Sequence, residues 1–135
     1  MTGFSLKIVT PDGLQFDGLA EELVVRTTTG DMGILAGHIN CVAPLGMGRA
    51  TVMVEGVKRY GACIGGMVSV IDGEVVLVPT TFEWADQIDV DRAEKSRQRA
   101  KAVLDDKNSA RMDADLARAR LRRALLRKDI ANHYK

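Results

Sequence analysis

Arginines at helical spacing are the residues whose types and positions best suit binding chemistry. Arg92 and Arg99 lie seven positions apart. Arg120, Arg123 and Arg127 follow the same periodicity near the C-terminus. This spacing places side chains on one face of a helix. Guanidinium groups stay charged and bind phosphate oxygens in pairs, so two such segments folded back on each other would form a site for a phosphate-bearing ligand.

Asp89 and Glu83 could accept hydrogen bonds from a ribose or a base amine in such a ligand site. The arginines also fit a simpler interpretation. From spacing alone, a solvated helix surface with ion pairs one turn apart is the favoured interpretation, and such pairs contribute little to stability. The pairs with this spacing are Asp91–Lys95 and Asp115 with Arg118 or Arg120.

The other reactive residues form no pattern of a metal centre or a nucleophilic active site. His38 and His133 are remote from each other and have no neighbouring ligand cluster. Cys41 and Cys63 stand in apolar runs, which is typical of reduced core cysteines in a cytosolic protein. No Gly-x-Ser-x-Gly elbow is present. We therefore expect a protein with no catalytic residues, no metal and no obligatory cofactor.

The first part of the chain has the pattern of short β-strands joined by tight turns. Phe4, Leu6 and Ile8 alternate with other residues and so share one face of a strand. Glu55-Gly56 and Asp72-Gly73 lie between β-branched runs, and Asp-Gly is a strong hairpin motif. Closely spaced strands without helices between them predict an antiparallel sandwich or barrel. The expected strands are residues 4–10, 14–17, 21–28, 39–45, 51–54, 57–60, 67–71 and 74–78.

Two stretches of this part lack a strand pattern. Residues 30–33 contain two glycines and are expected to form a loop, followed by a short apolar insertion at residues 34–35. Residues 82–87 are expected to form a short linker to the helices. Trp84 or Phe82 in that linker is expected to pack where the sheet meets the helices.

The period of the apolar residues changes to that of a helix at residues 88–93. Asp89 is a favourable N-cap residue, and Asp91 places negative charge in the first turn. Asn108 or Ser109 is the expected N-cap of a second helix. Two helices with so short a connection predict an antiparallel hairpin. Its apolar stripes are mostly Ala, which buries little area, so the hairpin should be marginally stable and able to open.

Charge is unevenly divided between the two parts. Five basic and ten acidic residues precede Ile88, whereas 14 basic and 8 acidic residues follow from that position. A basic second helix suits docking on an acidic protein better than on nucleic acid, because acidic residues are interleaved and no aromatic residue precedes Tyr134. One function consistent with the residues is a free-standing β-sandwich binding module. Its basic helical tail would dock on nucleic acid or an acidic protein.

Four motifs in a fixed order resemble the ε subunit of bacterial F-type ATP synthases. They are Ile8–Gly13, Thr29–His38, Val42–Leu45 and Ile88-Asp89-x-x-Arg92-Ala93. The resemblance extends over essentially the whole chain and implies an α+β fold. That fold is an N-terminal antiparallel β-sandwich of about ten strands, residues 1–86, followed by a C-terminal antiparallel two-helix hairpin, residues 87–135.

The resemblance also implies a non-catalytic rotor subunit of the central stalk, which couples ion flow to ATP synthesis. The sandwich would contact the γ subunit and the c-ring, with Asp31 and His38 in the contact region. The helices would inhibit ATP hydrolysis when extended toward the catalytic α/β subunits and permit it when folded. The implied location is the cytoplasmic face of the bacterial cell membrane, reached only through the complex, with no nucleic-acid partner. The residues expected to meet the β subunit are Arg118, Arg120, Arg122 and Arg123.

In family members that bind ATP, the nucleotide holds the hairpin closed, so ATP is implied as a regulatory ligand. Arg123-Ala124-x-x-Arg127 matches the second-helix motif, although the spacing between the two helix motifs is one residue longer than in the ATP-binding pattern. The positions that carry over are Glu83, Ile88, Asp89, Arg92, Ala93, Arg99, Arg123 and Arg127.

Overall fold

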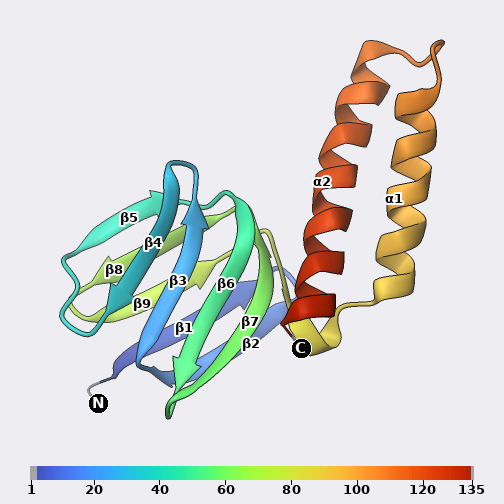
Figure 1. Cartoon of the computed structure of the whole chain (residues 1–135). Helices are drawn as coiled ribbons and strands as arrows, with labels where there is room; N and C mark the ends of the chain where they lie inside the picture. Colours follow the sequence, from blue (N-terminus) through green and yellow to red (C-terminus); the bar gives the residue numbers. More distant parts are fainter. Residues whose placement is uncertain (1–2, 135) are drawn as a thin grey trace. The chain divides into compact units, whose positions relative to one another are not determined.

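The computed structural model describes residues 3–134, which form ten β-strands, one short 3-10 helix and two α-helices (Figure 1). The chain divides into two compact units, Met1–Trp84 and Ala85–Lys135. The strands are β1 (Phe4–Thr10), β2 (Gly13–Ala20), β3 (Glu22–Thr27), β4 (Gly30–Leu35), β5 (Cys41–Pro44), β6 (Met47–Val54), β7 (Val57–Ile64), β8 (Met67–Ile71), β9 (Glu74–Val78) and β10 (Thr81–Trp84). The helices are η1 (Ala85–Gln87), α1 (Val90–Asp105) and α2 (Arg111–His133).

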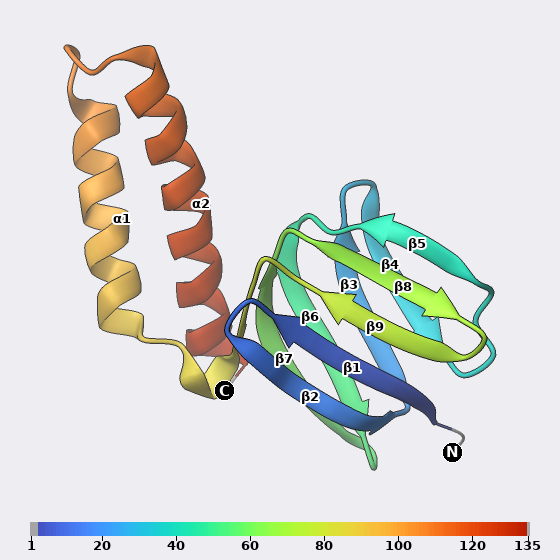
Figure 2. The same ribbon diagram turned by 180° about the vertical axis from the view of Figure 1, so that it is seen from behind.

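The first unit is a β-sandwich of two five-stranded sheets. One sheet has the strand order β2-β1-β9-β8-β5, and the other has the order β10-β7-β6-β3-β4. Figure 1 shows the second sheet in front, and Figure 2 shows the first sheet from behind. The paired strands are antiparallel except for β1 and β9, whose parallel pairing joins two hairpins into one sheet. The predicted ten-stranded sandwich followed by two helices is confirmed.

Alternating side chains build the core of the sandwich. In β1, Phe4, Leu6 and Ile8 are buried while Ser5 and Lys7 are exposed, as the sequence pattern predicts. Inward-facing residues of both sheets, mostly Val, Ile and Leu, form one continuous cluster. Burial of this apolar area stabilises the fold by ~25 cal/mol per Å².

The two predicted hairpins are present. Glu55 and Gly56 have φ angles of 50° and 77°, and Asp72 and Gly73 have φ angles of 51° and 83°. Positive φ at both central residues matches the right-handed twist of the flanking strands. These turns connect β6 to β7 and β8 to β9.

Residues 30–33 belong to strand β4, so the predicted loop is wrong. Strand β4 pairs with β3 over its whole length, and Arg26 faces Asp31 with an ion pair of 2.9 Å. Met32 packs against the core and Ile34 is fully buried. Gly and Asp have low β-propensity, so pairing with β3 decides the conformation of this stretch.

Strand β10 occupies the first half of the predicted linker and η1 the second half, so that prediction is also wrong. Strand β10 pairs with residues 61–64 of β7. Phe82 and Trp84 lie in the sandwich core, with their rings 4.9 Å apart in an edge-to-face arrangement. The indole N–H of Trp84 donates to the Gln15 carbonyl at 3.4 Å, and the Arg59 guanidinium lies 3.8 Å from the ring centre. These contacts make Trp84 an anchor of the sandwich.

The first helix begins where the sequence predicts, and the second does not. Asp89 is the N-cap of α1, and its Oδ1 accepts the Arg92 backbone N–H at 3.0 Å. The N-cap of α2 is Ala110, which makes no side-chain cap bond. The Ser109 hydroxyl instead donates to the Val103 carbonyl at 2.8 Å, satisfying an acceptor in the last turn of α1. The expected cap at Asn108 or Ser109 is therefore wrong.

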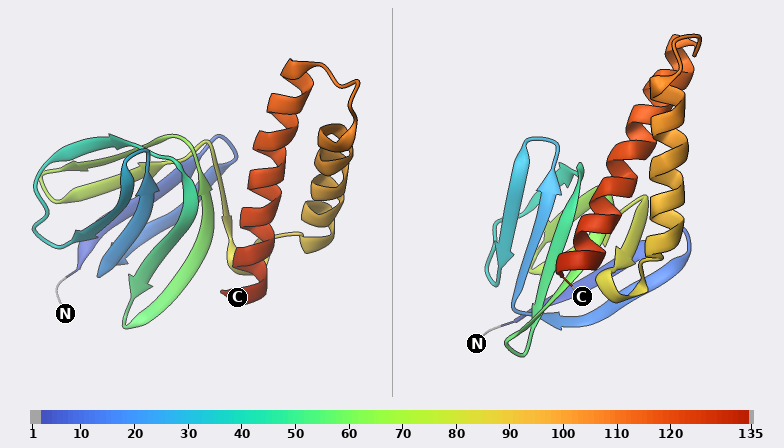
Figure 3. Two further views of the ribbon diagram at one scale, coloured as in Figure 1. Left: turned by 45° about the horizontal axis from the view of Figure 1, so that its top comes forward. Right: turned by 45° about the vertical axis from the view of Figure 1, so that its right-hand side comes forward.

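The second unit is the predicted antiparallel hairpin, whose helices lie side by side in both views of Figure 3. Its helices bury Ala93 and Ala100 on α1 and Ala117, Ala124 and Ala131 on α2, together with Ile130. Small side chains allow the helices to approach closely but bury little apolar area. Neither helix, within the part of the chain that the structure describes, is apolar over a length that could span a membrane.

Candidate functional site

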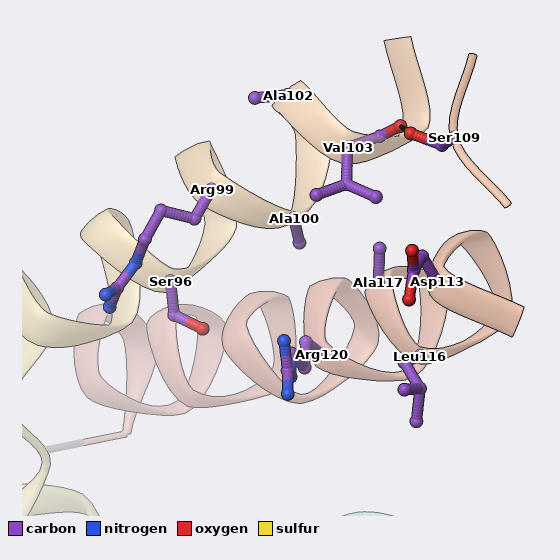
Figure 4. Close-up of a pocket in the computed structure, with 10 residues that line it drawn as sticks. All are labelled: Ser96, Arg99, Ala100, Ala102, Val103, Ser109, Asp113, Leu116, Ala117 and Arg120. Atoms are coloured by element: carbon purple, nitrogen blue, oxygen red, sulfur yellow. Dashed lines mark hydrogen bonds between the residues drawn. The ribbon is translucent and has the colours of Figure 1, made fainter. Parts of the chain in front are cut away.

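A cleft with a volume of about 760 Å³ lies between α1 and α2 (Figure 4). Ligand pockets commonly have volumes of ~300–1,000 Å³, so the cleft can hold a small molecule. Ala100 and Val103 of α1 and Ala117 and Leu116 of α2 supply its apolar lining. The narrow alanine stripe thus leaves room between the helices near the end of α1.

Polar side chains divide the cleft into a basic part and an acidic end. Ser96 and Arg99 of α1 and Arg120 of α2 line the part away from the helix connection, whereas Asp113 and Ser109 lie next to that connection (Figure 4). Guanidinium and hydroxyl groups bind anions, and a carboxylate accepts hydrogen bonds from hydroxyl or amino groups. The cleft therefore suits a ligand with an anionic group and hydrogen-bond donors at opposite ends.

Glu94 of α1 joins the two helices through its carboxylate. It accepts hydrogen bonds from Arg97 at 2.6 to 3.1 Å and from Gln98 at 3.2 Å, both on α1. It also accepts a hydrogen bond from the Lys128 ammonium on α2. The bonds from Arg97, and then from Lys128, lower the pKa of Glu94 to about 2. No sequence pattern indicates this bridge, because Glu94 and Lys128 are 34 residues apart.

The predicted nucleotide-binding residues near α1 have different surroundings. Ile88 and Ala93 are buried, and Asp89 is exposed and caps the helix. The Arg92 side chain is exposed. Arg99 lines the cleft between the helices. The first helix thus places one of its two predicted arginines in the cleft.

The remaining predicted residues lie outside the lining of this cleft. Arg123 and Arg127 are half-buried on α2, and Glu83 is half-buried on β10 in the first unit. Arg120, predicted as a protein contact, is the α2 arginine in the lining. The seven-residue intervals of the buried alanines in both helices could have indicated the register that brings Arg120 to this position.

The other residues predicted to contact protein partners are at the surface or close to it. Asp31 is exposed on β4, and His38 is half-buried after that strand, with Nδ1 2.8 Å from the Ile39 carbonyl oxygen. Arg122 is exposed on α2. Arg118 forms an ion pair of 2.5 Å with Asp115 one turn earlier, as the solvated-surface interpretation expects.

The cysteines lie in the sandwich. Cys63 is buried in its core, and burial raises the pKa of its thiol to about 12. Cys41 is half-buried and packs against the same core. Among residues 3–134, no group of three or more His, Cys, Asp or Glu side chains is arranged to hold a metal ion.

Comparison with known proteins defines the class of the chain. Residues 3–85 match the family described as ATP synthase, Delta/Epsilon chain, beta-sandwich domain. The chain therefore belongs to the ATP synthase delta/epsilon chain family. Over 133 residues it is 40% identical to the ATP synthase epsilon chain of Ruminococcus albus and 38% identical to that of Shouchella clausii, with 98% of each chain covered. The resemblance inferred from the four sequence motifs is confirmed.

Solved structures share the fold. A chain of the Euglena gracilis mitochondrial ATP synthase (OSCP/F1/c-ring) has a TM-score of 0.70 and 23% identity, with 98% of this chain and 79% of that chain covered. A chain of the Tetrahymena thermophila mitochondrial ATP synthase (central stalk/c-ring) has a TM-score of 0.59 and 16% identity, with 94% and 95% covered.

Proposed function

We propose that the chain is a non-catalytic rotor subunit in the central stalk of a bacterial F1Fo ATP synthase, where it couples ion flow to ATP synthesis. The observation that carries this proposal is the match to epsilon chains over 98% of both chains, which spans the sandwich and the helices. The subunit would lie at the cytoplasmic face of the cell membrane, peripherally and only through the complex. Its partners would be the γ subunit, the c-ring and the α/β subunits.

The region around β4 and β5 is the proposed contact with the γ subunit or the c-ring. Leu35, Ile39 and Val42 have exposed fractions of 57%, 77% and 61%. Large apolar side chains exposed within one short stretch of the chain are a common feature of protein interfaces. Asp31 and His38 lie in the same region and would add polar contacts.

The helices are the proposed regulatory part. Their alanine packing contributes little free energy, so an open and a closed hairpin can differ by only a few kcal/mol. An open α2 would present its basic side chains to an acidic segment of the β subunit and inhibit ATP hydrolysis. The proposed contact residues are Arg118, Arg120, Arg122 and Arg123.

ATP is the proposed ligand of the closed hairpin. A phosphate group bound by Arg99 and Arg120 in the cleft would join the helices, and Asp113 would accept hydrogen bonds from the ribose or the base. ATP would then shift the population toward the closed state, since both helices present these groups together only there. The resemblance to ATP-binding family members adds further proposed ligand residues that do not line this cleft, namely Glu83, Ile88, Asp89, Arg92, Ala93, Arg123 and Arg127.

Co-purification tests the proposed function against the free-standing binding module. The full chain, mixed with a γ subunit from a bacterial ATP synthase, should elute with it at a defined stoichiometry. The alternative module should instead bind nucleic acid with an affinity that falls steeply as salt rises. Nucleic-acid binding of that kind without a γ complex would contradict the rotor assignment.

A further inference from the structure

Charge opposes the close packing of the two helices. Helix α1 carries five basic and three acidic residues, and α2 carries seven basic and three acidic residues. Neighbouring helices of the same net charge repel each other. The buried alanines between them provide little apolar area to offset this repulsion. The closed hairpin therefore depends on attractive contacts between the helices.

Glu94 makes such a contact from a fixed position. Arg97 donates to both carboxylate oxygens, at 2.6 Å to Oε1 and 3.0 Å to Oε2. This fork orients the carboxylate, and Lys128 of α2 donates to Oε2. The side chains of Glu94 and Lys128 are 30% and 29% exposed. Partial exclusion of water strengthens their attraction relative to a fully exposed pair.

We propose that Glu94 acts as an internal anion that holds the hairpin closed in the absence of a bound ligand. Its carboxylate bridges basic groups of both helices, as a phosphate group would. The inference rests on the proposed regulatory function of the helices. It adds that part of the free energy that favours the closed hairpin is independent of ATP. The Glu94–Lys128 bridge then determines what fraction of the chains has an open hairpin without ligand, and only this open form would inhibit ATP hydrolysis.

Hydrogen–deuterium exchange of the full-length chain without nucleotide measures the open population of both helices. Glu94→Gln and Lys128→Gln should each raise helix exchange about two- to fivefold at low salt, the range for a partly exposed ion pair. The double variant should exchange no faster than the faster single variant, because each change removes the same contact. Raising the salt from about 50 to about 500 mM should shrink these differences.

Matched variants separate the bridge from a general charge effect. Asp115→Asn changes the net charge as Glu94→Gln does but breaks only the pair with Arg118 within α2, whose side chains are 60% and 55% exposed. Arg122→Gln is the corresponding control for Lys128→Gln, since Arg122 is exposed on the same helix. Both controls should leave helix exchange within about 1.5-fold of the unchanged protein. Lys128→Arg should retain most of the protection.

Equal exchange in Glu94→Gln and Asp115→Asn would overturn the proposal, as would fully additive effects of Glu94→Gln and Lys128→Gln. Calorimetric titration of the same proteins with ATP, with and without Mg²⁺, separates this inference from the ATP proposal. If the exchange data show non-additive effects of Glu94→Gln and Lys128→Gln but the titration shows no heat at millimolar ATP, only the ATP proposal is contradicted. If ATP binds but the effects of the two substitutions on exchange are additive, only the proposed bridge is contradicted.

Discussion

Two carboxylates have separate roles in the helical hairpin: one caps the start of α1, and the other joins α1 to α2. Asp89 accepts the Arg92 backbone N–H and so satisfies one of the unpaired donors in the first turn of α1. Glu94, one turn later, bridges to α2 through Lys128. The first role depends on neighbouring residues and the second on a distant one. Each can be removed by one substitution.

Asp89→Ala should destabilise α1 by about 1 kcal/mol, because the first turn loses its side-chain acceptor. Urea unfolding followed by far-UV circular dichroism measures this loss. Asp89→Ser keeps an acceptor oxygen and should recover most of it. Equal stability of Asp89→Ala and the unchanged protein would contradict the capping role.

The contribution of Glu94 should depend on pH. Its pKa is lowered from 4.5 to about 2 in the folded chain, so its stabilising effect is present above pH 4.5 and disappears as the pH falls toward 2. We therefore expect the stability difference between the unchanged protein and Glu94→Gln to shrink as the pH falls from about 5 to about 2. Comparing the two proteins cancels the titration of the other acidic groups. A difference that stays constant over this range would contradict the assignment.

At the scale of elements, two strands and one helix cap differ from what their local sequence predicts. In each case, contacts with other parts of the chain decide the structure. Strand β4 forms although its sequence is that of a turn, because β3 provides a complete ladder. Strand β10 forms because Phe82 and Trp84 fill the sandwich core. Ser109 bonds to the end of α1 and so does not cap α2. The Gly65–Gly66 turn between β7 and β8 is a further element whose sequence is restricted by its contacts with another part of the chain.

Gly66→Ala should destabilise the sandwich by at least about 2 kcal/mol, because it adds an atom to a packed turn. Gly66 has a φ of +94°, and an added Cβ would lie 2.0 Å from the Val78 carbonyl oxygen. Gly73→Ala is the matched control, since Gly73 has a φ of +83° but open space around it. Gly73→Ala should destabilise the sandwich by only about 1 kcal/mol, because only the positive φ is unfavourable for Ala there. Thermal unfolding that ranks the two variants equally would contradict the steric argument.

At the scale of the whole molecule, the two units differ in what holds them together. The sandwich has a continuous apolar core that includes residues of β10. The hairpin has small apolar contacts, a bridge at Glu94 and a cleft lined by charged residues. Such a difference suits a rigid docking unit and a unit that changes conformation.

Removing the residues after Asp86 should leave a folded sandwich and raise ATP hydrolysis by the assembled enzyme. All ten strands lie before this point, so the core residues remain. Hydrolysis should rise because the proposed inhibitory helices are absent. The assay compares complexes reconstituted with the truncated and the full-length chain. Equal rates would contradict the inhibitory role.

Much of the fold could be predicted from local sequence. Alternation in β1, the Asp72-Gly73 turn and the Asp89 cap all involve residues close together in the chain, where backbone preferences and side-chain periodicity act directly. The convergence of arginines from both helices was also expected from spacing. Arg99 and Arg120 both line the cleft, while Arg123 and Arg127 lie outside its lining.

By itself, the sequence determined that strands precede two helices, where the first helix begins, and that basic residues share helix faces. Only the tertiary structure decided that β4 and β10 are strands, which arginines line the cleft, and that Glu94 bridges to Lys128. The physical reason is the range of the interactions. Local preferences are encoded by neighbours in the chain, whereas strand partners, helix register and cross-helix ion pairs depend on residues brought together by folding.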